Sequence, residues 1–242
     1  MKFPPVYFML SVLVLSSGAR GAEPSPPATL VHEERAAELH DREPKKFRQH
    51  PAAAERIDFD EIDYDLLAAA VFHETNRQRA RHKLPALVYQ PELREAACIQ
   101  ARGMLKEGKI SHIHPNEGKE TLADRIDYVG LRGRYFSENV AMVFGRQYQS
   151  GEPFFSREED GTMIVSETHG GPPIPAHTYL SFARSLVGSW MDSPGHRRNI
   201  LARDPQALGA ECLHTRGPDG MDLFYCAQVF FAPFEMPVKQ GD

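Results

Sequence analysis

The sequence predicts an α+β or three-layer domain of about 175 residues. Apolar residues recur at helical spacing between about residues 66 and 104 and again over residues 182–191. The last part of the chain, residues 208–231, changes to the pattern of β strands and is rich in Phe, Tyr and Val. The candidate functional residues, which are histidines and one acid, lie in the connections between these elements.

Residues 1–19 have the composition of a secretory signal. Lys2 precedes an apolar run over residues 6–15, and small residues follow, which is the order that such signals show. Cleavage after Ala19, with Ser17 near the cleavage site, fits the small-residue rule best. The run is too short to span a bilayer and no second run follows, so we expect a secreted or periplasmic protein with no transmembrane segment in the mature chain.

The overall charge is mildly acidic. The chain holds 28 Lys and Arg against 33 Asp and Glu, which gives a formal net charge of −5. Because such a protein repels polyanions on average, we do not expect nucleic acid as a partner. No run of lysines indicates a patch for a membrane surface.

A stretch of low apolar content follows the signal. Residues 20–59 consist mainly of Pro, Ala, Glu, Lys and Arg and hold few large apolar side chains. Such a stretch buries too little surface to offset the entropy lost on ordering. We therefore predict a disordered lead-in or linker over residues 20–59 and a folded domain over residues 60–235.

Two helices are predicted at the start of this domain. Acids over residues 60–65 favour the positive end of a helix dipole, and the helical spacing then continues until Pro85 ends it. Pro91 is well placed in the first turn of a second helix. Alanines on the apolar face of this helix predict close packing against another layer, with Cys98 as a buried thiol.

The middle of the chain holds three candidate site residues. His112 and His114 are two apart, so in an extended segment they share a face and can reach one metal, or both are exposed loop histidines. A short helix over residues 122–126 stops at Gly130. Glu138 is surrounded by apolar residues, which predicts a carboxylate that is buried with partners or faces a cleft.

Residues 146–177 interrupt the regular pattern. They are rich in Gly and Pro, and a loop this long is a lid, a binding insertion or a mobile segment. Its histidines, His169 and His177, are surface residues that are able to add ligands to a site.

A helix, a turn and a hairpin complete the domain. The helix over residues 182–191 must stop at Pro194 and Gly195, which places His196 on a turn. Two β runs then flank a Gly-Pro-Asp-Gly turn, with Cys212 on one arm and Cys226 on the other. A disulfide between them closes a loop of about 15 residues and contributes about 3 kcal/mol. It leaves Cys98 as the odd thiol.

Four segments of the chain carry a resemblance to a known family. In chain order they are Asn76, Ile110-Ser111-His112, Ser137-Glu138-Asn139-Val140-Ala141 and Trp190-Met191-Asp192-Ser193-Pro194-Gly195-His196-Arg197-Arg198-Asn199-Ile200-Leu201. They resemble the CAP superfamily, which takes in cysteine-rich secretory proteins, antigen 5 and pathogenesis-related 1 proteins, and the chain is similar to its bacterial branch. The resemblance covers about residues 62–232.

The resemblance implies an α-β-α sandwich with a central, mostly antiparallel sheet and a cleft lined by two histidines and two acids. Carried over onto this sequence, the histidines are His112 and His196 and one acid is Glu138. Animal and plant members have the second acid three residues after the tryptophan, where this chain has Ser193. The insertion at 146–177 is a second departure from the family pattern.

Two neutral imidazoles from separate loops are a fair ligand pair for zinc or another divalent metal, with positions left open for water. We expect metal at His112 and His196, with Glu138 either orienting a histidine or taking a proton from the water. Further candidates for the cleft are Ser193, His114, His169 and His177.

Three functions fit these residues. Our first expectation is a secreted binding module whose partner is a lipid, a cell-envelope component or a protein; the resemblance implies sterol or lipid binding for some members. The alternative is a metal-assisted hydrolase or peptidase that uses His112, His196 and Glu138. The third is a stable extracellular scaffold. The sequence contains no His-Glu-x-x-His motif and no Gly-x-Ser-x-Gly motif, which favours binding over catalysis.

Overall fold

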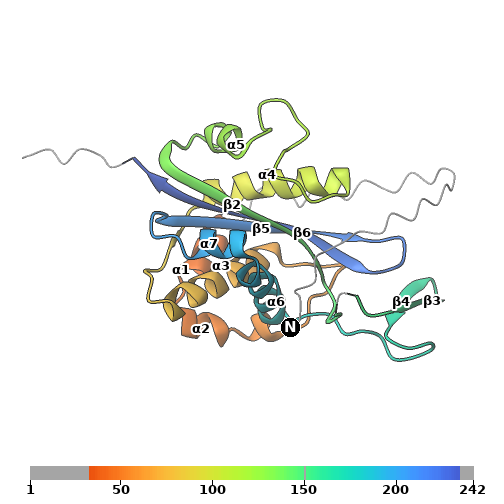
Figure 1. The fold of residues 1–242 in the computed structure, drawn as a ribbon. Helices are drawn as coiled ribbons and strands as arrows, with labels where there is room; N and C mark the ends of the chain where they lie inside the picture. The colour runs from red at the N-terminus through yellow and green to blue at the C-terminus, as the bar shows by residue number, and fades with distance from the viewer. Residues whose placement is uncertain (1–32, 150, 235–242) are drawn as a thin grey trace, which may run out of the picture.

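The computed structural model describes residues 33–149 and 151–234, so the expected signal over residues 1–19 lies outside the described residues. A four-stranded sheet separates two layers of helices (Figure 1). One apolar core fills the space on each side of the sheet. The predicted α-β-α sandwich is therefore confirmed.

The central sheet is mostly antiparallel. Its strands are β1 (Val88–Tyr89), β2 (Gly133–Phe144), β5 (Ala207–Arg216) and β6 (Asp222–Pro233), in the order β1-β5-β6-β2. Only β1 and β5 pair in parallel. The predicted C-terminal hairpin is confirmed as β5 and β6, and β2 is a long edge strand beside them.

One face of the sheet is covered by α4 (Pro91–Glu107) and α5 (Leu122–Tyr128). The predicted close packing of α4 is confirmed, because Ala96 and Ala97 are fully buried. Helix and strand approach so closely at Gly209 that a Cβ there would lie 2.1 Å from the backbone nitrogen of Arg94. Glycine is therefore required at this position of β5.

The other face is covered by α3 (Tyr64–Arg81), α6 (Tyr179–Asp192) and α7 (Pro194–Ile200). Each long helix begins at a side-chain cap: Asp63 accepts the Leu66 N–H, and Thr178 forms a capping box with Ser181. Trp190 of α6 is 1% exposed and belongs to the core beneath the sheet.

The prediction of a disordered lead-in is wrong for residues 33–59. These residues form α1 (Glu33–Asp41), α2 (Pro44–Arg48) and a short 3-10 helix, η1 (Pro51–Ala54). Leu39, Phe47 and Ile57 are buried in the core beneath the sheet. The few apolar residues of this segment suffice because they all reach the face that α3 and α6 already present. The remainder of the expected lead-in, residues 20–32, lies outside the described residues.

The insertion at 146–177 contains a hairpin of its own, formed by β3 (Phe155–Glu159) and β4 (Thr162–Ser166). Its two ends meet, because the His177 N–H donates to the carbonyl of Gly145 at 2.8 Å. Arg146 at its start binds the buried carboxylate of Asp222, with Nε 2.8 Å from Oδ2. The insertion is thus attached to the end of the main sheet.

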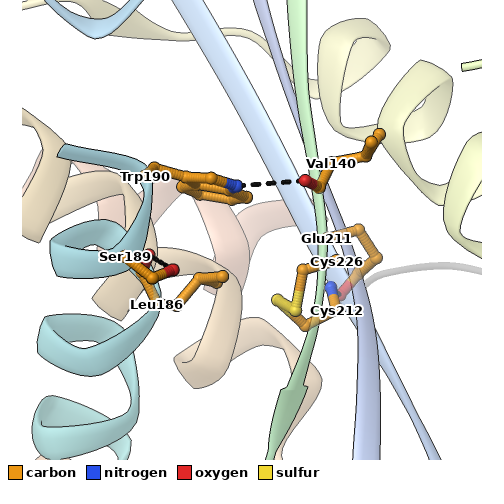
Figure 2. Close-up of a disulfide and its surroundings, with 7 residues drawn as sticks. All are labelled: Val140, Leu186, Ser189, Trp190, Glu211, Cys212 and Cys226. Carbon is orange, nitrogen blue, oxygen red and sulfur yellow. Dashed lines mark hydrogen bonds between the residues drawn. A yellow bond between two sulfur atoms is a disulfide. The ribbon is translucent and has the colours of Figure 1, made fainter. Parts of the chain in front are cut away.

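The predicted disulfide is confirmed. Cys212 and Cys226 are directly opposite each other on β5 and β6 and are bonded (Figure 2). Cys98 is the free cysteine and is buried in α4, as expected.

None of the helices in residues 33–149 and 151–234 is both long and apolar enough to cross a membrane.

Candidate functional site

Two histidines approach the free edge of β2 from opposite layers of the sandwich. His112 lies in the connection between α4 and α5, and its ring contacts Glu138 on β2. The prediction that His196 lies on a turn is wrong: α6 ends before Pro194 as expected, but Pro194 then begins a new helix, α7, which contains His196. The carbonyl of His196 accepts a hydrogen bond from Asn139, the next residue of β2, at 3.3 Å. The structure therefore brings together the three residues on which the sequence prediction depended.

Glu138 holds the ring of His112 in a defined orientation. Nδ1 of His112 lies 2.8 Å from Oε2 of Glu138, and the carboxylate accepts, so Nδ1 carries the proton. The other ring nitrogen, Nε2, then presents its lone pair. The side chain of His112 is 57% exposed whereas that of Glu138 is 3% exposed, so a buried carboxylate orients a largely exposed imidazole.

The second oxygen of Glu138 is bound by Arg125. Nη2 of Arg125 donates to Oε1 at 2.6 Å, and the side chain of Arg125 is 0% exposed. Its Nη1 donates to the carbonyls of Lys119 and Glu120, at 3.1 and 3.2 Å. Arg125 therefore compensates the buried charge of Glu138 and also holds the segment between His112 and α5. The sequence prediction missed it, because an arginine in a short helix resembles an exposed one.

A second network joins α7 to β2. The side-chain amide of Asn199 donates to the carbonyl of Glu138 at 3.1 Å and to Oδ1 of Asn139 at 2.8 Å. These bonds fix the position of His196, which α7 carries. In the opposite layer, Gln100 of α4 donates to the carbonyl of Ser111 and so anchors the segment before His112.

His196 is half-buried and favours its neutral form. Burial lowers the pKa of His196, and the nearby His112 lowers this pKa further. At neutral pH its imidazole therefore has a lone pair available for a ligand.

The other proposed cleft residues lie elsewhere or make no polar contact with these histidines. Ser193 joins α6 to α7, and its hydroxyl caps neither helix. His114 does not share a face with His112: it is 5% exposed, lies against Gly103 of α4 and accepts the Asn116 N–H at 3.1 Å. The segment bends between the two histidines, so the extended geometry that we assumed is absent.

The histidines of the insertion are not part of the cleft. His169 is exposed beside Phe155 of β3, with ring centroids 4.7 Å apart. His177 precedes α6, where Nδ1 lies 2.9 Å from the hydroxyl of Ser181. Both residues therefore contact other parts of the chain than the segment of His112 and the helix of His196.

The residues around His112 and His196 offer few protein ligands for a metal ion. Across the described residues, no group of three or more His, Cys, Asp or Glu side chains is arranged to hold a metal ion. Glu138 has both oxygens engaged, so the available ligands are the imidazoles of His112 and His196. Two neutral imidazoles suit a borderline cation such as zinc, with water as the remaining ligands.

A comparison with protein families identifies this architecture. The model described as the cysteine-rich secretory protein family, or CAP, matches residues 72–230. The chain belongs to this family. The matched CAP region runs from α3 to β6, so α1, α2 and η1 are additions that precede it. No curated protein matches the chain in sequence.

Several solved bacterial structures are similar to this CAP protein. An extracellular protein with an SCP domain from Bacillus anthracis is 21% identical over 73% of this chain, with a TM-score of 0.46. An outer surface protein from Borrelia burgdorferi is 17% identical over 74% of this chain and 98% of its own, with a TM-score of 0.44. The CAP domain of enterococcal PrgA is 14% identical over 89% of this chain and 84% of its own, with a TM-score of 0.43. This chain spans 44% of the length of the Bacillus protein.

Proposed function

We propose that this CAP protein is an exported binding module whose cleft holds a divalent cation, with zinc the best fit, through His112 and His196. The bond between Nδ1 of His112 and Glu138 carries this proposal, because it leaves Nε2 free on an exposed ring. Such outer-sphere support of a ligand histidine is the usual arrangement in metal sites. A bound cation would supply positive charge and open coordination positions for an oxygen donor of a partner.

The surroundings of His112 support a partner that has an apolar part. Ile110 and Ile113 flank the histidine and are 48% and 61% exposed, and Phe136 precedes Glu138 on the same face of β2 and is 40% exposed. Exposed apolar side chains beside polar groups are typical of ligand-binding surfaces. We propose a lipid, a cell-envelope component or a protein segment as the partner.

Two features support export. The first nineteen residues have the charged, apolar and small-residue order of a secretory signal. The disulfide between Cys212 and Cys226 is of the kind that persists in oxidising compartments.

The proposal is tested by metal affinity. Equilibrium dialysis against zinc should show that His112→Ala with His196→Ala lowers the affinity at least tenfold, because no other ligand group replaces the imidazoles. His169→Ala, which removes an exposed histidine of the insertion, is the matched control and should bind as the wild type does. Equal affinity of the double variant and the control would refute the metal site.

The hydrolase alternative has less support. It needs Glu138 as a base, but Arg125 and His112 occupy both of its carboxylate oxygens. It also lacks a second acid at Ser193. Turnover of peptide or ester substrates by zinc-loaded wild type, lost in Glu138→Gln, would overturn our preference for binding.

A further inference from the structure

Three arginine-rich segments of the chain meet at one end of the sheet. They are the C-terminal end of α3 with the two residues after it (79–83), the start of β2 with the residue before it (132–134), and α7 with the loop that follows it (194–203). None of the three contains an acid, although the chain as a whole has 33 acids against 28 Lys and Arg. Their exposed cations, which we call the basic face, are Arg81, Lys83, Arg132, Arg134, Arg197, Arg198 and Arg203.

The end of α3 and the loop after α7 form one surface. Arg79 is fully buried, and its Nη1 donates to the carbonyls of Ile200 and Ala202, each at 2.8 Å. Outside this contact, Nη2 of Arg197 lies 3.4 Å from Nε2 of His82. Arg79, the buried residue of the first segment, therefore holds the exposed cations of α3 and α7 side by side.

The start of β2 joins the same surface. Nη1 of Arg134 lies 3.4 Å from Oδ1 of Asp204, directly after the loop of α7. Both β2 and β5 are antiparallel to β6, so they begin at the same end of the sheet (Figure 1). Strand β1, which pairs with β5, adds an apolar residue at this end. Val88 is 64% exposed, and its N–H donates to the carbonyl of Gln206 at 2.9 Å.

The charge of the basic face is largely uncompensated. Asp204 is paired with Arg134, and Asp192 lies just before α7. Seven cations on one end create a local positive potential even though the net charge of the chain is negative. The sequence prediction missed this surface because no single segment contains a long basic run.

We propose that the basic face binds a membrane surface that carries anionic lipid headgroups. Guanidinium groups bind phosphate in two-point geometry, and cations near an anionic bilayer each raise partitioning about fivefold. The cations surround the end of the sheet instead of following one strand or helix, which suits a broad surface better than a single extended polymer. Val88 adds an apolar contact at the same end.

Docking in this way brings His196 close to the lipid surface, because α7 carries both His196 and two cations of the basic face. The interaction does not depend on the metal or on the ligand of the cleft. It is therefore independent of the function proposed above, and the double variant of His112 and His196 should still bind vesicles.

The test is co-sedimentation of the full chain with phosphatidylcholine vesicles, with and without phosphatidylglycerol, in the presence of EDTA. The wild type should bind the vesicles that contain phosphatidylglycerol and not those of phosphatidylcholine alone. Its affinity should rise with the phosphatidylglycerol content. Arg132→Glu with Arg198→Glu and Arg203→Glu should weaken this binding at least about 100-fold, which is fivefold per cation removed. Raising the salt from about 0.15 to 1 M shortens the Debye length from about 8 to 3 Å and should release the protein.

The control variant has the same net charge but an intact basic face. Lys45→Glu, Lys106→Glu and Arg184→Glu alter exposed cations of α2, α4 and α6 and should leave vesicle binding unchanged. Circular dichroism checks that both triple variants fold. If one of them does not fold, the release of the wild type at high salt still tests the proposal. Equal binding by the two triple variants overturns the proposal. So does binding of soluble polyphosphate or heparin by a wild-type chain that ignores anionic vesicles.

Discussion

Arg125 supports the orientation of His112 without contacting it. The side chain is buried, yet it binds Glu138, which in turn orients His112. Ion pairs at this depth lose their hydration, so each partner is stable only in the presence of the other. The carboxylate is thereby committed to a supporting role.

We predict that Arg125→Met lowers the free energy of unfolding by roughly 3 to 5 kcal/mol, because it leaves the carboxylate of Glu138 buried without a cation. Adding Glu138→Gln should recover part of this loss, since the amide carries no charge. Urea unfolding measures both variants. Arg184→Met, which changes an exposed residue of α6, is the control. Its free energy of unfolding should stay within about 0.5 kcal/mol of the wild-type value.

At this scale the sequence predicted the residues of the cleft but not those that support it. His112, Glu138 and His196 were grouped through the resemblance to the CAP superfamily, because the local pattern alone singles out each residue but does not place the three together. Arg125 and Asn199 were not found, because burial and partners decide their role and neither follows from local spacing. The pairing of His112 with His114 required an extended backbone that the structure does not have.

At the scale of elements, the docking of α1 and α2 depends on two buried histidines. His40 stacks on Tyr89 with ring centroids 3.7 Å apart, and its Nδ1 lies 2.6 Å from the carbonyl of Ala36. His73 of α3 stacks on Phe47, and its Nε2 donates to a carbonyl of α1 at 2.9 Å. Burial lowers the pKa of both rings and so favours their neutral forms, and each ring bonds to a backbone carbonyl.

We predict that acid weakens this docking. Burial lowers the pKa of His40 to about 3, and Arg94 and His73 act in the same direction. Because the unfolded value is near 6.5, the stability from His40 is complete above pH 6.5 and falls by about 1.4 kcal/mol per pH unit below it. His40→Phe keeps the stacking but has no group to protonate. Between pH 7 and 5 its free energy of unfolding should therefore fall by about 2 kcal/mol less than that of the wild type.

Thermal unfolding at the two pH values measures this difference. His169→Gln removes an exposed histidine and should keep the full pH dependence of the wild type. If His40→Phe and the wild type respond to acid equally, His40 does not contribute to the acid sensitivity.

The long helices α3, α4 and α6 and the terminal hairpin were predicted because their periodicity is long and regular. The short helix α7 was predicted as a turn, because Pro194 and Gly195 indicate a helix stop as readily as a new start. The segments α1 and α2 were not, because short helices with one or two apolar residues each are recognisable only beside the surface that they cover. The insertion was predicted as a loop, although β3 and β4 pair within it, because their sequences are polar and interrupted by Gly.

At the scale of the whole molecule, the three cysteines have separate roles. The bond between Cys212 and Cys226 joins the two central strands, and Cys98 lies in the helical layer above them. Burial raises the pKa of the Cys98 thiol to about 12, so the thiol is unreactive in the folded protein.

We predict one alkylatable thiol in the unfolded, unreduced protein and three after reduction. Intact mass after iodoacetamide treatment counts them, and peptide mapping should place the single label at Cys98. The folded protein should take up almost no label at pH 8, because the thiolate is disfavoured and covered. Three labels before reduction would mean that the disulfide does not form.

The hydrogen bonds that join α6 and α7 to β2 also affect how copies of this protein meet one another. As an edge strand, β2 could extend the sheet by pairing with a strand of a second copy. Asn199 occupies the carbonyl of Glu138, and the indole of Trp190 donates to the carbonyl of Val140 at 3.3 Å (Figure 2). The motif that delivers His196 thus also engages two carbonyls that a strand of a second copy would need for pairing with β2.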